Sequence, residues 1–124
     1  MVIVDTDVII AAIRANKMAL GILLKYKSKG LYISQVTEME LFAGATNAAK
    51  KNAVNEVLRN HEVLPLSKAI GDKAAQLLKT YNNKRGVLML ADALIAATCI
   101  HHGCSLITFN TKDFRRIKGL QLTK

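Results

Sequence analysis

The N-terminal stretch MVIVDTDVII places two carboxylates, Asp5 and Asp7, directly after a short apolar run. Residues 2–4 are Val, Ile and Val, which is typical of a strand buried on both faces. In an open α/β sheet, ligands usually bind beyond the carboxyl ends of the strands, so an acid at this point is a candidate site residue. The alternative is that the acids start the next helix by capping its amides and complementing its dipole. This stretch alone supports both interpretations equally.

Three further acids lie where a carboxylate suggests chemistry. Asp92 interrupts the apolar segment VLMLADALIAATCI, and a buried carboxylate needs hydrogen bonds, a cation or a metal. A first-turn acid favoured by the helix dipole is the alternative there. Glu40 either closes a capping box with Thr37 or, if Ser34 is the cap, lies inside the helix and is free for chemistry. Asp113 follows the apolar strand SLITF, although NTKDF is also an ordinary turn sequence.

These acids from separate parts of the chain can all converge on one crevice of a parallel sheet. Two carboxylates about 4 Å apart repel by roughly 4 kcal/mol at an effective dielectric near 20. A shared site therefore either raises their pKa values or holds a hard divalent cation, and oxygen ligands favour Mg²⁺ or Mn²⁺. Such a site on a basic protein suits metal-assisted phosphodiester hydrolysis.

The overall charge points to a polyanionic partner. Eighteen Lys and Arg against nine Asp and Glu give a net charge of +9, enough to attract nucleic acid by long-range steering. The alternative is that Lys-rich faces only confer solubility. The chain has three Tyr, three Phe and no Trp, which disfavours a base-stacking platform and leaves phosphates as the expected contact.

Composition also predicts the compartment and the number of domains. Cys99 and Cys104 do not form a C-x-x-C pair, which indicates reduced thiols in a cytoplasmic protein. The start carries acids where a signal peptide carries basic residues, and the longest apolar stretch, 87–100, is too short to span a bilayer. We expect one domain over residues 1–124, because no linker, repeat or biased tract divides the chain.

Strands and helices alternate along the sequence. Short apolar segments predict strands at 2–4, 31–33, 62–66, 104–110 and 120–122, and helical spacing or capping residues predict helices at 8–15, 18–30, 34–45, 47–60, 67–82 and 90–103. Alternating strands and helices imply parallel pairing. The predicted fold is a three-layer α/β/α domain around a mainly parallel sheet.

The segments IVDTDVII, ISQVTEMELFAGA, ADALIAATCIHHGCSLITFNTKDF and GLQL together resemble the PIN-domain family, specifically the VapC-type toxin ribonucleases of type II toxin–antitoxin systems. The resemblance covers nearly the whole chain in order and spacing. It implies a compact α/β/α fold and an endoribonuclease that cuts RNA with Mg²⁺ or Mn²⁺. It also implies a homodimer and a cognate antitoxin whose C-terminal segment blocks the acidic groove, often by inserting an Arg or Lys.

The resemblance assigns roles to individual residues. By motif position, the catalytic and metal-binding acids are Asp5, Glu40, Asp92 and Asp113. Thr6 matches a small hydroxyl position suited to orienting a metal-bound water or a phosphate. Asn110 occupies the other polar position of the last motif, where many PIN domains have Asp, so the sequence departs from the family pattern there. Asp7 is expected to cap the following helix.

Two rival functions compete with this interpretation. VDTDVI also resembles the D-x-D motif of haloacid-dehalogenase phosphatases, in which Asp5 would be the nucleophile, but no adjacent acidic pair follows downstream. A non-catalytic RNA-binding module with a degenerate site is the second rival, and the retained acids count against it. Zinc binding by His101, His102 and the two cysteines is disfavoured, because their spacing lacks a paired C-x-x-C.

Overall fold

The computed structural model describes residues 1–123; Lys124, the last residue of the predicted domain, lies outside them. Five strands form one sheet in the order β3-β2-β1-β4-β5, with all four pairings parallel. The strands are β1 (Val2–Val4), β2 (Leu31–Ser34), β3 (Glu62–Leu64), β4 (Ser105–Ile107) and β5 (Gln121–Leu122). The helices are α1 (Thr6–Ile13), α2 (Lys17–Tyr26), η1 (Lys27–Lys29), α3 (Gln35–Ala43), α4 (Ala48–Arg59), α5 (Lys68–Tyr81), α6 (Leu90–His102) and α7 (Thr111–Phe114).

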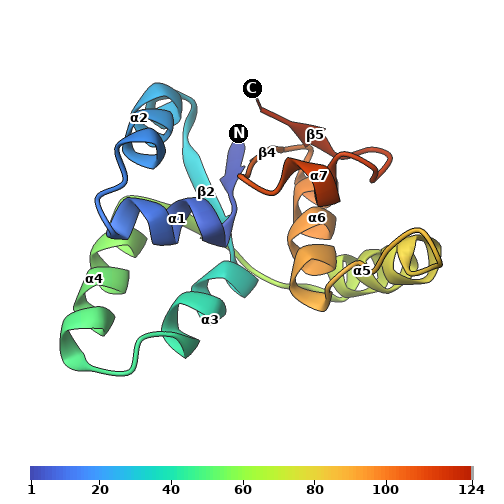
Figure 1. Cartoon of the computed structure of the whole chain (residues 1–124), viewed down its shortest axis with the longest axis horizontal. Coiled ribbons are helices and arrows are strands. Elements are labelled where there is room, and N and C mark those ends of the chain that lie inside the picture. The colour runs from blue at the N-terminus through green and yellow to red at the C-terminus, as the bar shows by residue number, and fades with distance from the viewer. Residues whose placement is uncertain (124) are drawn as a thin grey trace.

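Helices cover both faces of the sheet (Figure 1). Val2 and Val4 pack in one apolar cluster with α1, α2 and α4, whereas Ile3 packs in a second cluster with α5 and α6. Successive strand residues point to opposite faces, so a strand apolar at every position is one that is covered on both sides. The three-layer α/β/α architecture with a parallel sheet is therefore confirmed.

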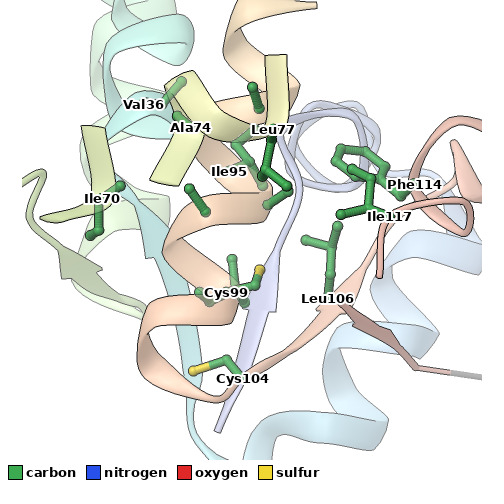
Figure 2. Packing of buried hydrophobic residues seen from close by; sticks show 14 of the residues in the cluster. Val36, Ile70, Ala74, Leu77, Ile95, Cys99, Cys104, Leu106, Phe114 and Ile117 are labelled. Carbon is green, nitrogen blue, oxygen red and sulfur yellow. The ribbon is translucent and has the colours of Figure 1, made fainter. Parts of the chain in front are cut away.

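The second cluster anchors the helix that presents Asp92. Ile95 and Cys99 of α6 belong to the same buried cluster as Leu106 of β4, Phe114 and Ile117 (Figure 2). All five side chains are almost fully buried. Because α6 is fixed along its length by this packing, the position of its first turn at the end of the sheet is fixed as well.

Several element ends differ from the sequence prediction. The helix expected to run to Gly30 ends at Tyr26 and tightens into η1 before Gly30 turns with a φ of 81°. The strand expected at 62–66 stops at Leu64, since Pro65 has no amide hydrogen for the ladder. The last strand is shorter by one residue than predicted. None of the helices within residues 1–123 has the length and apolar character needed to cross a membrane.

Candidate acidic active site

Asp5 lies at the carboxyl end of β1 and is only 5% exposed. Its Oδ1 accepts a hydrogen bond from the Thr6 amide at 2.8 Å, and its Oδ2 accepts one from the Thr108 hydroxyl at 2.7 Å. The Asp5 amide in turn donates to the Ile107 carbonyl at 2.9 Å. Residues that follow β1 and β4 therefore hold this carboxylate in place at the carboxyl end of the sheet.

Asp5, rather than Asp7, is the residue that caps α1. Its backbone is extended, and its carbonyl accepts from the amides of Val8 and Ile9. Asp7 instead lies in the first turn, where its Oδ2 accepts from the Phe109 amide at 3.2 Å. The expectation that Asp7 caps the helix is wrong, because the bend between strand and helix falls one residue after the strand ends.

Glu40 lies inside α3, which Ser34 caps through its hydroxyl and the Thr37 amide at 3.1 Å. The capping-box alternative is thereby excluded, since Glu40 faces the Thr6 hydroxyl, at 2.7 Å from its Oε1. The Thr6 and Thr37 hydroxyls are 3.0 Å apart. Thr6 has one hydroxyl proton, so donating it to Glu40 makes Thr6 the acceptor toward Thr37. A chain of hydroxyls thus orients the Glu40 carboxylate.

Asp92 lies in the first turn of α6 and is half-buried. α6 begins at Leu90, as predicted, so Asp92 occupies the first-turn position that the sequence left open as the alternative. The preceding Val87 and Met89 are exposed, so the apolar run around Asp92 is not buried throughout. Burial raises the pKa of Asp92, and the charges of Glu40, Asp113 and Asp7 raise it further. The first turn of α6 thus places Asp92 close enough to the other acids for their charges to act on it.

Asp113 lies on α7 and is exposed. The Asn110 side-chain amide donates to its Oδ2 at 3.0 Å, while the Asn110 backbone amide donates to the Thr108 hydroxyl at 2.9 Å. The turn after β4 therefore connects Asp113 to Thr108, which itself holds Asp5. Sequence reasoning missed Thr108, because it placed this residue inside the predicted strand 104–110, whereas β4 ends at Ile107 and leaves the Thr108 hydroxyl free to reach Asp5.

We call these carboxylates the acidic cluster: Asp5, Asp7, Glu40, Asp92 and Asp113. Burial raises the pKa of Asp5 to about 7, and the charges of Asp7 and Asp92 add to this effect, while the hydrogen bonds from Thr108 and Thr6 oppose it. Burial likewise raises the pKa of Asp7. In the described part of the chain, the two salt bridges are elsewhere, Arg59 with Glu56 and Lys68 with Asp72, so no ion pair neutralises the cluster there.

The donor set fits a hard divalent cation. Every ligand atom that the acidic cluster can offer is a carboxylate oxygen, which is the type of ligand that Mg²⁺ and Mn²⁺ prefer. One of these oxygens, Asp7 Oδ1, is buried and has no hydrogen-bond partner among residues 1–123. Over the same residues, no three acid, His or Cys side chains already converge closely enough to hold a metal by themselves. Mg²⁺ does not need such a cage, because it is commonly held by one or two carboxylates and several waters.

A groove of about 430 Å³ opens beside the cluster, between α1, α3 and α4. Its walls are largely apolar, with Ile10, Ile13, Leu41 and Val54 among them, and Glu40 also lines it. Glu40 therefore belongs both to the acidic cluster and to the lining of this apolar groove.

Comparison with known proteins identifies the family. The PIN domain family model matches residues 2–120. Ribonuclease VapC10 of Mycobacterium tuberculosis is 31% identical over 122 residues, covering 98% of this chain and 91% of the relative.

Two solved structures share the fold. A toxin–antitoxin complex from Klebsiella pneumoniae has a TM-score of 0.81 and 29% identity, covering 97% of this chain and 95% of the matched chain. VapBC2 from Rickettsia felis, bound to a promoter DNA fragment, has a TM-score of 0.86 and 23% identity, covering 99% and 98%. The acidic cluster at the end of a parallel sheet, the match over nearly the full chain and these relatives agree: the chain belongs to the PIN-domain family, among its VapC-type members.

Proposed function

We propose that this chain is a metal-dependent endoribonuclease that hydrolyses RNA phosphodiester bonds and acts as the toxin of a toxin–antitoxin pair. The observation that supports it best is the acidic cluster, whose carboxylates come from the end of β1 and from α1, α3, α6 and α7. Burial and the negative charges of the neighbouring acids raise the pKa values of Asp5 and Asp92, and no acid of the cluster has an ion-pair partner among the described residues. The similarity to a VapC ribonuclease over nearly the whole chain agrees with this activity. The family assignment displaces the phosphatase alternative, whose resemblance covers only the first motif.

We assign metal binding to Asp5, Glu40, Asp92 and Asp113, with Mg²⁺ or Mn²⁺ as the cation. Bound there, the metal would supply hydroxide at neutral pH and stabilise the leaving oxygen. The protein's contribution is orientation. Thr108 holds Asp5, Thr6 holds Glu40, and Asn110 holds Asp113, so each of these acids has a hydrogen-bonding partner that restricts its rotation.

The test is cleavage of mixed cellular RNA by the purified protein with Mn²⁺, with EDTA, and with the Asp5→Asn variant as the contamination control. Metal-dependent cuts that disappear in the variant establish the nuclease. Cuts that persist in EDTA or in the variant would contradict it. Absence of cutting on every folded and unfolded RNA tested would favour the non-catalytic RNA-binding alternative.

The hydroxyl of Thr6 provides a sharper test of how Glu40 is held. Thr6→Val keeps the side-chain volume but removes the hydrogen bond to Glu40, so we expect cleavage to fall roughly 10- to 100-fold. Thr6→Ser keeps the hydroxyl and should retain most of the rate. Equal activity of the valine and serine variants would show that this hydrogen bond does not position the acid.

The toxin–antitoxin complex among the structural neighbours supports an antitoxin partner for this chain. The apolar groove beside Glu40 is suited to an apolar segment of such a partner, because most of its walls are Ile, Leu, Val and Ala side chains, with Arg14, Glu40 and Lys50 as its charged lining residues. An antitoxin segment seated there would lie beside Glu40 of the acidic cluster. We place this interaction in the cytoplasm, consistent with the free cysteines Cys99 and Cys104.

A homodimer is the second partner we propose. Large apolar side chains are exposed on α3 and around the start of α6. They are Met39 on α3 (48% exposed), Val87 and Met89 before α6 (71% and 63%) and Leu90, its first residue (65%), and α3 packs against α6. Exposed apolar side chains that gather on neighbouring elements mark a protein interface, whereas single ones are ordinary on a protein surface.

Leu90→Lys is therefore expected to convert a dimer into a monomer, as measured by light scattering. Leu24→Lys is the matched control, since Leu24 is 73% exposed on α2, away from this surface. A monomeric wild-type protein, or equal effects of the two variants, would contradict the proposed interface.

A further inference from the structure

Two segments distant in the sequence are joined at Tyr81, the last residue of α5. The Tyr81 hydroxyl accepts a hydrogen bond from the Lys118 amide at 2.8 Å, and the Arg116 guanidinium lies over the Tyr81 ring at 5.7 Å from its centroid. Arg116 also lies against Gly86, where an added Cβ would be 3.5 Å from the guanidinium. In Figure 1 the yellow end of α5 and the red loop after α7 lie on the same side of the molecule.

These two segments concentrate positive charge. Residues 79–86 and 112–118 together contain seven Lys and Arg and a single acid, Asp113. We call the exposed or half-buried cations here the Tyr81 patch: Lys79, Lys84, Arg85, Lys112, Arg115, Arg116 and Lys118. Among the described residues, none of them forms a salt bridge, since both ion pairs lie on α4 and α5 away from this end.

The composition of the patch favours phosphate groups as ligands. It contains three of the five arginines of the chain, and the planar guanidinium binds phosphate with two parallel hydrogen bonds. Arg116 is held by the Tyr81 ring and Gly86, so part of the cost of ordering its side chain is already met by the fold. A solvated lysine face built only for solubility would not need such a fixed arginine.

The patch begins beside the acidic cluster. Arg115 follows Asp113 by two residues, and its amide donates to the Thr111 carbonyl at 2.9 Å, so it continues the turn of α7. A carboxylate cluster repels an approaching polyanion unless cations flank the path. The Tyr81 patch provides such cations on the Asp113 side of the cluster.

We propose that the Tyr81 patch binds the phosphodiester backbone of RNA on the side of the acidic cluster nearest Asp113, and so positions the strand for cleavage. This rests on the proposed ribonuclease function. Phosphates are the contacts that we assign to the patch, because its seven cations suit phosphate oxygens and because Arg116 covers the Tyr81 ring on which a base could otherwise stack. It therefore contributes affinity without choosing the sequence.

The test compares two charge-matched triple variants. The patch variant is Arg85→Gln, Arg115→Gln and Lys118→Gln, which keeps Arg116 and its contact with Tyr81. The control variant is Lys17→Gln, Lys29→Gln and Lys51→Gln, three exposed lysines on α2, η1 and α4. Binding of fluorescein-labelled oligouridylate is measured by anisotropy in EDTA over a range of KCl concentrations. Thermal unfolding of both variants confirms that they fold.

We expect the patch variant to bind roughly tenfold more weakly near 0.1 M salt, with the slope of log K against log[salt] reduced by about 2, as three lost phosphate contacts predict. The control variant should lose less than about twofold. With Mn²⁺ and a cleavable RNA, the patch variant should raise KM and leave kcat unchanged. Equal losses in the two variants, or a lower kcat with unchanged KM, would overturn the proposal.

Two further outcomes are distinguishable from these. Polyglutamate of equal charge that displaces the RNA at equal concentration would assign the patch to an acidic protein and overturn the proposal. If the wild type cuts no RNA but the patch variant alone loses RNA affinity, the ribonuclease function fails while the patch stands as an RNA-binding surface. The anisotropy measurement does not depend on cleavage, so the two failures are separable.

Discussion

Replacing Asp5 or Asp92 with asparagine is expected to lower the rate of RNA cleavage by about 10³-fold or more. The two carboxylates interact electrostatically, and each lies where charge must be balanced by a cation. A metal ion contributes several kcal/mol of charge stabilisation, and each 1.36 kcal/mol corresponds to about tenfold in rate. The loss is measured as the single-turnover cleavage rate with saturating Mn²⁺.

Asp72→Asn is the matched control. Asp72 is exposed on α5, where it pairs with Lys68 at 2.8 Å, so its loss removes an acid without touching the cluster. An exposed pair of this kind is worth less than about 1 kcal/mol. We expect unchanged cleavage and nearly unchanged stability. Cleavage that survives both Asp5→Asn and Asp92→Asn would show that these residues do not form the reaction centre.

The sequence was sufficient to predict that the acids would lie at one end of the sheet, within electrostatic range of one another. Val2–Val4 reads as a doubly covered strand, and such a strand requires a parallel sheet whose carboxyl ends share an edge. Asp5 and Asp113, which follow β1 and β4, are placed by that rule alone. The positions of Glu40 and Asp92 depend in addition on where their helices begin, because the first residue of a helix determines the direction in which each side chain points.

What the sequence did not predict depends on single-residue backbone geometry. Ser34 and Thr37 were equally good caps, and only the extended backbone of Ser34 decides that Glu40 is free to face Thr6. In the same way, Asp5 caps α1 and Asp7 does not, because the chain bends from strand to helix at Asp5. Thr108 was missed because its importance comes from a hydrogen bond to Asp5 across 103 positions of sequence, which no local pattern encodes.

Without metal, the folded protein is expected to lose stability as the pH rises. Asp5 has a pKa of about 7 when folded, against an ordinary value of 3.8, so between these values the folded chain holds a proton that the unfolded chain has released. The free energy of unfolding therefore falls across this window, by up to about 4 kcal/mol from Asp5 alone. The raised pKa values of Asp7 and Asp92 act in the same direction.

Other groups contribute a pH dependence of their own. His61 has a lowered pKa because of burial, so its contribution to stability increases as the pH rises. The measurement is therefore the difference between wild type and Asp5→Asn in urea unfolding with EDTA, near pH 5 and near pH 8. The substituted asparagine side chain cannot ionise, so we expect the variant to gain stability relative to wild type at the higher pH. Parallel pH profiles of the two proteins would contradict the raised pKa.

Metal should reverse this difference. A cation that binds only the folded carboxylates stabilises the protein by about 2.7 kcal/mol at a hundredfold excess over its dissociation constant. Adding Mg²⁺ near pH 8 is therefore expected to raise the unfolding free energy of the wild type and to leave Asp5→Asn nearly unchanged. The effect should shrink near pH 5, where protons compete with the metal for Asp5. Equal stabilisation of both proteins at both pH values would place the metal away from Asp5. Asp5 is the acid that we expect a bound cation to stabilise most, because it is buried at the end of β1.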